Sequence, residues 1–132
     1  MHETAQIIID DVLAFHDDME NSDIPTEREL RDYGLLASAV NSAFQTFMGE
    51  DLYPDMLAKA AHLCYGISNN HPFVDGNKRA AVHTMLAYLL LNDVEINYQQ
   101  EELYNMGMAV AMGKMSCEEI ASWLKERITN NS

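Results

Sequence analysis

The chain has 132 residues, of which 48% are apolar and 22% are charged, and this size and composition predict one compact domain over residues 1–132. Its 21 acidic residues outnumber its 8 basic residues and give a net charge of −13, which argues against direct binding to nucleic acid and against docking on an anionic membrane. The longest apolar run, Met85–Leu91, is far shorter than the ~18 residues of a membrane span, and the N-terminus lacks an export-signal pattern, so we expect a cytoplasmic protein.

Apolar residues recur along most of the chain with the 3.6-residue period of an α-helix, and long alternating stretches typical of strands are missing. The first predicted elements are, in order, a helix over Thr4–Met19, a loop or short hairpin over Ile24–Tyr33, a helix whose apolar face runs from Leu36 to Phe47 with Gly49 just beyond, and a helix that starts near Pro54 and ends before Pro72.

The segment Asn77–Leu91 is apolar on almost every side over its second half, which is typical of a helix surrounded by protein. After it, the predicted elements are a turn at Asn92 and Asp93, a short extended piece over Val94–Tyr98, a helix from Leu103 to Gly113, and a last helix announced by the capping box of Ser116 and Glu119. We therefore predict an all-α bundle of six to seven helices with a central buried helix.

Sulfur-containing residues suggest no separate chemistry. Cys64 and Cys117 lie far apart without a CxxC or Cys/His spacing, so reduced thiols are favoured over a zinc site or a disulfide scaffold. Met108, Met112 and Met115 have helical spacing, and we interpret them as core residues in preference to a redox or metal feature.

One segment differs from an ordinary helical bundle. Residues 69–79 read NNHPFVDGNKR, and they precede and open the predicted central helix. A helix N-terminus presents unpaired backbone N–H groups and the positive end of the helix dipole, which together attract phosphate. Gly76 lets the backbone approach an anion closely, and Lys78 and Arg79 add a point charge and a forked donor in the first helical turn.

Two further side chains of this segment have chemistry that phosphate transfer requires, and a third is expected to anchor the loop. Asp75 supplies a hard oxygen ligand, placed to hold Mg²⁺ against the phosphates. His71 titrates near neutral pH and is suited to take a proton from an attacking hydroxyl. Phe73 is expected to point into the core and to anchor the loop.

The string His71–Arg79, HPFVDGNKR, resembles the signature HxFx(D/E)GN(G/K)R of the Fic/Doc family. Arg31–Val40 and Gly49–Pro54 are similar to the upstream segments of its death-on-curing branch, so the resemblance covers nearly the whole chain. It implies a Fic/Doc-type helical fold with a short flap, here Pro25–Asp32, that positions the target.

The resemblance also implies roles for single residues. His71 would deprotonate the target hydroxyl, Asp75 would bind Mg²⁺, and Phe73 would anchor the loop in the core. The phosphate of ATP would be bound by Gly76, Asn77 and Arg79, together with Lys78.

Two positions bear on which reaction the family resemblance implies. AMP-transferring members usually have Gly where this chain has Lys78, and they commonly carry another Arg where it has Val82. The death-on-curing branch includes a kinase with Lys at that place, which transfers the γ-phosphate of ATP to a Thr of elongation factor Tu. Lys78 therefore favours phosphoryl transfer, although Pro72 and Gly76 differ from that kinase. AMP transfer and a non-catalytic nucleotide-binding or partner-binding module are the alternatives.

Many family members are restrained by an inhibitory helix with the pattern [S/T]xxxE(G/N). Ser122–Glu126 fits the first five positions, but Arg127 stands where Gly or Asn belongs, so a chance match is the better interpretation. The resemblance then implies restraint by a separate antitoxin chain, and a toxin that halts translation.

Overall fold

The computed structural model describes residues 3–20, 32–47, 50–51, 55–73 and 76–128. Its elements are α1 (Glu3–Glu20), α2 (Tyr33–Ala43), β1 (Thr46–Phe47), β2 (Glu50–Asp51), α3 (Met56–Asn70), α4 (Asn77–Leu91), α5 (Gln100–Ala111) and α6 (Cys117–Lys125). The all-α bundle is therefore confirmed, with one antiparallel pairing of two-residue strands beside it (Thr46 with Asp51, Phe47 with Glu50).

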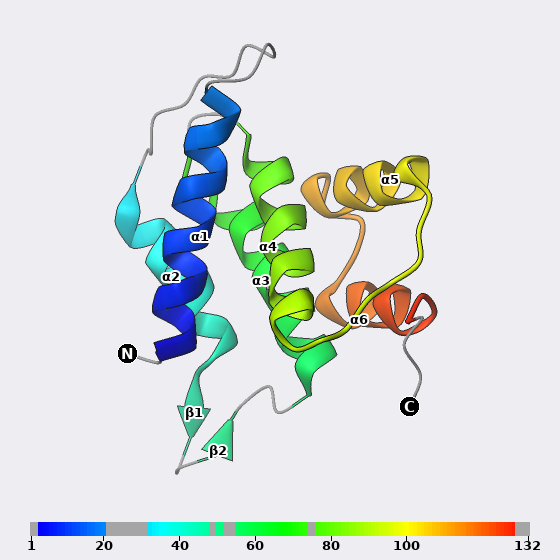
Figure 1. Ribbon diagram of the computed structural model, residues 1–132, viewed down its shortest axis with the longest axis horizontal. Coiled ribbons are helices and arrows are strands. Elements are labelled where there is room, and N and C mark those ends of the chain that lie inside the picture. Colours follow the sequence, from blue (N-terminus) through cyan, green and yellow to red (C-terminus); the bar gives the residue numbers. More distant parts are fainter. Residues whose placement is uncertain (1–2, 21–31, 48–49, 52–54, 74–75, 129–132) are drawn as a thin grey trace.

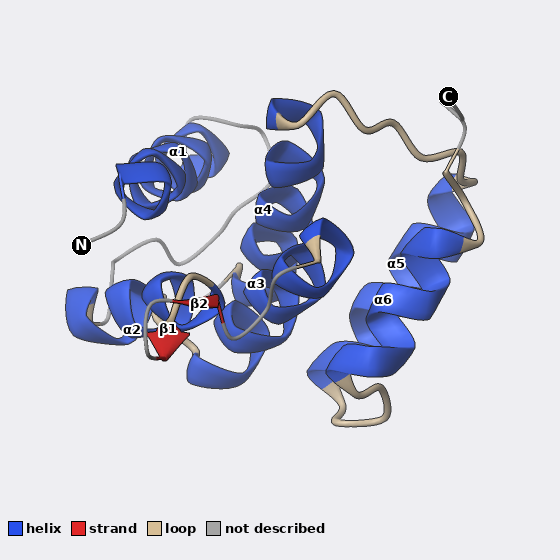
Figure 2. Cartoon of the chain, turned by 90° about the horizontal axis from the view of Figure 1, so that it is seen from below, coloured by secondary structure: helices blue, strands red, loops and turns tan. Residues whose placement is uncertain are grey.

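The helices form three layers (Figure 1). α3 and α4 pack against each other in the middle, α1 and α2 cover one side of them, and α5 and α6 cover the other. Seen from below, α5 and α6 both lie on the far side of α3 and α4 from α1 (Figure 2). α4 thus contacts both outer layers, which confirms its central position in the bundle.

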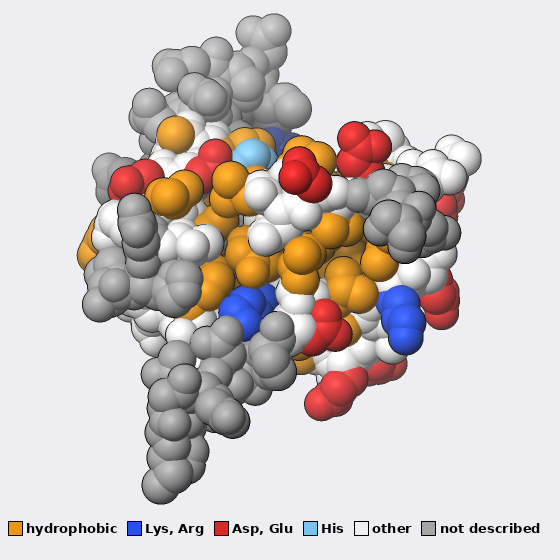
Figure 3. All heavy atoms as spheres, turned by 60° about the horizontal axis from the view of Figure 1, so that its bottom comes forward, with side chains coloured by type: hydrophobic (Ala, Val, Ile, Leu, Met, Phe, Trp, Pro, Cys, Tyr) orange, Lys and Arg blue, Asp and Glu red, His pale blue; other side chains and the backbone are white. Residues whose placement is uncertain are grey.

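The core lies between these layers, on the faces that the helical periodicity predicts. Ile8 and Val12 of α1 are buried, and so are Ala60, Ala61, Cys64 and Ile67 of α3 and Ala80, Ala81, Met85 and Leu89 of α4. The last turn of α4 is less enclosed than predicted, because Leu90 and Leu91 are 60% and 57% exposed. Hydrophobic side chains also gather across the middle of the face in Figure 3, with acidic ones mostly around them.

Two further predictions require correction. The second helix ends at Ala43 instead of continuing through Phe47: Phe44 is its C-cap, with its N–H directed to the Asn41 and Ser42 carbonyls, and Phe47 belongs to β1. Met112 is 58% exposed and is therefore not a core residue. Gly49, Pro54 and positions 25–31 of the expected flap lie outside the described residues.

The C-terminal half follows the sequence signals closely. Ser116 and Glu119 form the predicted capping box of α6, with both hydrogen bonds present. In the extended piece, Ile96 pairs with Ile128, and the Asn97 N–H donates to the Arg127 carbonyl over 2.7 Å. None of the helices within the described ranges combines the length and apolar character needed to cross a bilayer.

His62 of α3 links the two outer layers. Its Nε2 lies 2.9 Å from the Ser42 hydroxyl of α2, and its Nδ1 lies 3.7 Å from the Cys117 sulfur of α6. Burial lowers the pKa of His62 below its ordinary value of 6.5, because the interior disfavours the charged imidazolium. The folded protein therefore favours the neutral form of this ring more than the unfolded chain does.

This predicts a stability that falls on mild acidification. Below pH 6.5 the unfolded chain binds a proton at His62 more readily than the folded chain does, so the stabilisation present above that pH is lost as pH falls. His62→Gln keeps a hydrogen-bonding group beside Ser42 but does not titrate. We expect urea unfolding to show a smaller loss of stability between pH 7.5 and 5.5 in His62→Gln than in the wild type. Equal losses would contradict the assignment.

Candidate functional site

The candidate site lies where α3 ends and α4 begins. His71 is the C-cap of α3 in the left-handed conformation (φ 51°, ψ 58°), and its N–H donates to the Ile67 carbonyl over 3.3 Å. This conformation turns the chain out of α3 and leaves the His71 side chain at the surface. The imidazole of His71 is therefore at the surface of the protein, next to the start of α4.

The start of α2 is hydrogen-bonded to this turn. The Asp32 N–H donates to the Pro72 carbonyl over 3.1 Å, and the Asn70 side-chain amide donates to the Leu35 carbonyl over 3.1 Å. Asp32 is also the N-cap of α2, since its carboxylate accepts from the Gly34 and Leu35 N–H groups. One residue of the expected flap thus contacts the loop.

Phe73 and Asn77 anchor the loop, the first by burial in the core and the second by hydrogen bonds. The Phe73 ring is 2% exposed and is part of the core. The Phe73 N–H donates to Asn77 Oδ1 over 2.9 Å, and Asn77 Nδ2 donates to the Phe73 carbonyl over 2.9 Å. The Asn77 amide therefore clamps the loop backbone, a role that the sequence does not reveal.

Replacing Asn77 tests this clamp. Asn77→Ala leaves both Phe73 backbone groups without their partner, and we expect a loss of about 1–3 kcal/mol in the free energy of unfolding. Asn77→Asp is the matched variant, because it keeps the acceptor and loses only the donor, so its loss should be smaller. If Asn77→Ala kept full stability in urea and lost only nucleotide affinity, the amide would be a phosphate ligand and not a clamp.

The N-terminus of α4 has features that favour an anion. Gly76 is its N-cap with φ 83°, a left-handed conformation that glycine adopts without strain. Gly76 has no side chain with which to cap the helix, and the first turn of α4 contains no acidic residue. The backbone N–H groups and the helix dipole therefore favour a negatively charged ligand at this end.

The two cations of this turn differ in burial, and Lys78 is the less exposed of the two. Arg79 is exposed. The Lys78 ammonium donates to Met108 Sδ over 2.8 Å and lies 4.9 Å from the centre of the Tyr104 ring, so this side chain reaches across to α5.

A groove of about 340 Å³ starts at these cations and runs along α4 between α1 and α5. Most of its wall is apolar or aromatic, and the lining residues are Phe15, Lys78, Arg79, Val82, His83, Leu86, Gln100, Leu103, Tyr104 and Gly107. On the α1 side the Phe15 and His83 rings stack at 3.9 Å, and His83 Nε2 lies 2.7 Å from Asp11 Oδ2. The groove thus combines one cationic end with a mainly apolar body.

A divalent metal ion would depend on Asp75, which lies outside the described residues. Among the side chains that the structure does describe, no group of three His, Cys, Asp or Glu residues is close enough to hold a metal ion. The α4 N-terminus, with Gly76 as its N-cap, nevertheless fits the phosphates with which such an ion would be shared.

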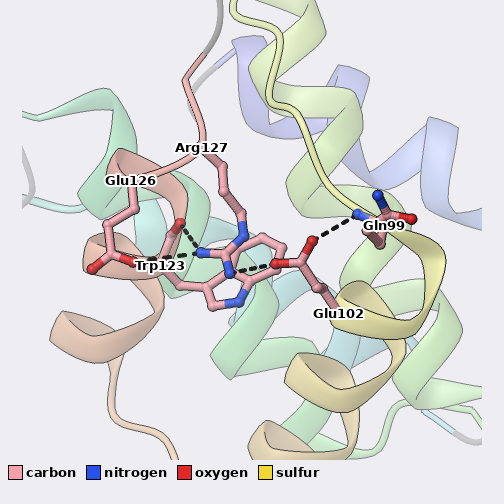
Figure 4. A network of polar contacts seen from close by, with 5 residues as sticks. All are labelled: Gln99, Glu102, Trp123, Glu126 and Arg127. Carbon is pink, nitrogen blue, oxygen red and sulfur yellow. Dashed lines mark hydrogen bonds and ion pairs between the residues drawn. The ribbon is translucent and has the colours of Figure 1, made fainter.

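The Ser122–Glu126 segment is held by α5 (Figure 4). Arg127 donates to Glu102 Oε2 over 2.7 Å, pairs with Glu126 at 3.6 Å, and stacks on Trp123. The Gln99 N–H and then the Arg127 guanidinium lower the pKa of Glu102. These contacts give the segment a structural role at the junction of α5 and α6.

The structure brings His71, Phe73, Gly76, Asn77 and Lys78 to the junction of α3 and α4, as their adjacency predicts. Sequence reasoning missed Tyr104 and Met108 of α5, which contact the Lys78 side chain. The signal in the sequence was that Tyr104 lies three residues before Gly107 and four before Met108, so that all three share one face of the helix.

Comparison with known proteins agrees with this architecture. Residues 6–89, from within α1 to near the end of α4, match the Fic/DOC family. The chain is also 43% identical over 70 residues to the protein named Toxin Doc of Mycolicibacterium smegmatis, an alignment that covers 53% of this chain and 54% of that protein. The chain therefore spans about half the length of the relative that it matches. Because the family match includes more than half of the chain and the whole loop with its helix start, the chain belongs to the Fic/Doc family.

Proposed function

We propose that this protein is a transferase that uses Mg-ATP to move a phosphoryl group onto a hydroxyl of a protein target. The observation that carries the proposal is the α4 N-terminus, which has Gly76, a residue without a side chain, as its N-cap and no acidic residue in its first turn. Such a helix end binds phosphate, and Lys78 and Arg79 add positive charge beside it.

The remaining residues of the loop supply the other parts of the reaction. His71 would accept the proton of the target hydroxyl, which its exposed position at the end of α3 supports. Asp75 would hold Mg²⁺, which neutralises phosphate charge when bound. Phosphoryl transfer depends mainly on positioning and charge stabilisation, and the buried Phe73 would help to position the residues beside it.

Phosphoryl transfer is favoured over AMP transfer by two residues that line the groove. Lys78 occupies the place where AMP-transferring relatives usually have glycine. Val82 replaces a common arginine, and its side chain packs on α5 at Gly107. One phosphate clamp of an AMP transferase is thereby absent at this position.

The biological role that we propose rests on the similarity to Toxin Doc. The name of the relative, Toxin Doc, supports a toxin that is restrained by a separate antitoxin chain. We propose elongation factor Tu in the cytoplasm as the protein target, and residues 1–132 as a single Fic/Doc domain.

The test compares ATP labelled at the γ-phosphate with ATP labelled at the α-phosphate. Each is incubated with purified protein, Mg²⁺ and a bacterial lysate supplemented with elongation factor Tu. A γ-label on a protein band is the expected result, and an α-label would mean AMP transfer. Lys78→Gly should shift the label from γ toward α. No label from either nucleotide would leave a non-catalytic binding module and reject the proposal.

A further inference from the structure

The Lys78 side chain leaves α4 and lies along one face of α5. Its ammonium contacts Met108 Sδ at 2.8 Å and faces the Tyr104 ring at 4.9 Å. Its aliphatic stem passes Gly107, where an added Cβ would lie 3.4 Å from Lys78 Cγ. Tyr104, Gly107 and Met108 are three and four positions apart, so they share one helix face and form a seat for this lysine.

The chemistry of the seat is unusual for a cation. Lys78 is the second residue of α4, where the positive end of the helix dipole disfavours an ammonium. Its partners on α5 are a thioether sulfur and an aromatic face, and neither carries a negative charge. The seat therefore fixes the ammonium in place without neutralising it, which leaves its charge to act on a ligand in the groove.

We propose that Tyr104 and Met108 are positioning residues that hold Lys78 at the α5 wall of the groove, where its ammonium meets the phosphates of a bound nucleotide. The inference rests on the proposed function and deepens it, because the place of this charge decides how the phosphates lie at the α4 N-terminus. If Lys78 lost its contacts with α5, its charge would no longer favour the arrangement in which the γ-phosphate is placed for transfer.

The seat is tested first without nucleotide. The chain has four lysines, which can be followed separately by mass spectrometry during reductive methylation. We expect Lys78 to react several-fold more slowly than the exposed Lys114 and Lys125. In the double variant Tyr104→Leu/Met108→Leu it should react as fast as they do. Tyr104→Phe keeps the ring and should behave like the wild type, and the buried Lys59 should react slowly in every variant that remains folded.

The second measurement is the affinity for Mg-ATP by calorimetry, which does not require transfer. The double variant should bind several-fold more weakly than Tyr104→Phe, and its ratio of γ-label to α-label should fall. If Lys78 were methylated equally slowly in the double variant and in the wild type, Tyr104 and Met108 would not be its seat. If the double variant bound Mg-ATP as tightly as Tyr104→Phe does, the seat would have no role in nucleotide binding. If the wild type transferred no label while both measurements behaved as expected, the proposed function would fail and the positioning of Lys78 would stand.

Discussion

His71→Asn is expected to abolish transfer to the protein target while the fold stays intact. General-base catalysis typically contributes about 10²–10⁴-fold to a rate, so its removal should lower label incorporation by at least two orders of magnitude. Asparagine is chosen because His71 has φ 51°, and asparagine tolerates the left-handed region better than alanine does. The side-chain amide has no titratable nitrogen that could take the hydroxyl proton.

The control for this prediction is another histidine substitution. His62→Gln changes a histidine that joins α2, α3 and α6, and it should retain transfer at pH 7.5. Circular dichroism and urea unfolding then establish that His71→Asn is folded. Transfer at the wild-type rate by a folded His71→Asn protein would exclude His71 as the base and would direct attention to another proton acceptor.

Local sequence signals were enough to locate most helices. The predicted and observed bounds of α4 agree because Gly76 and Asn92 stop the helix at both ends. The capping box of Ser116 and Glu119 is a local motif, and both of its bonds form. By contrast, the apolar period continues through Phe44 and Phe47, whereas the helix ends at Ala43, where backbone bonds close its last turn and the chain enters a strand pair.

The candidate site was predictable to the extent that its residues are neighbours in sequence. His71, Gly76 and Lys78 had to lie near one helix start, so their clustering required no tertiary information. The partners of these residues come from packing. Lys78 reaches Met108, 30 residues away along the chain, because α5 lies beside α4. The Asn77 clamp depends on the Phe73 backbone lying beside the first residue of α4, which a sequence pattern does not specify.

Phe73→Ala is expected to cause the largest loss of stability among these variants. The ring is 2% exposed and is among the largest fully buried side chains, so its truncation leaves a cavity in the core. Such substitutions cost about 3–5 kcal/mol. Against a total stability of about 5–15 kcal/mol, this loss is a large fraction of what holds the domain together. Thermal unfolding should show a Tm lower by about 10–20 °C.

Phe73→Leu separates the anchoring of the loop from the stability of the whole fold. Leucine keeps an apolar side chain in the core and should cost about 1–2 kcal/mol. Because Asn77 bonds to both backbone groups of Phe73, a displaced Phe73 also shifts the start of α4. At a temperature where circular dichroism shows both variants folded, we therefore expect weaker Mg-ATP binding by Phe73→Ala than by Phe73→Leu. Equal affinities would mean that the buried ring stabilises the core without positioning the phosphate-binding helix end, and the Asn77 clamp would then be sufficient to hold the loop.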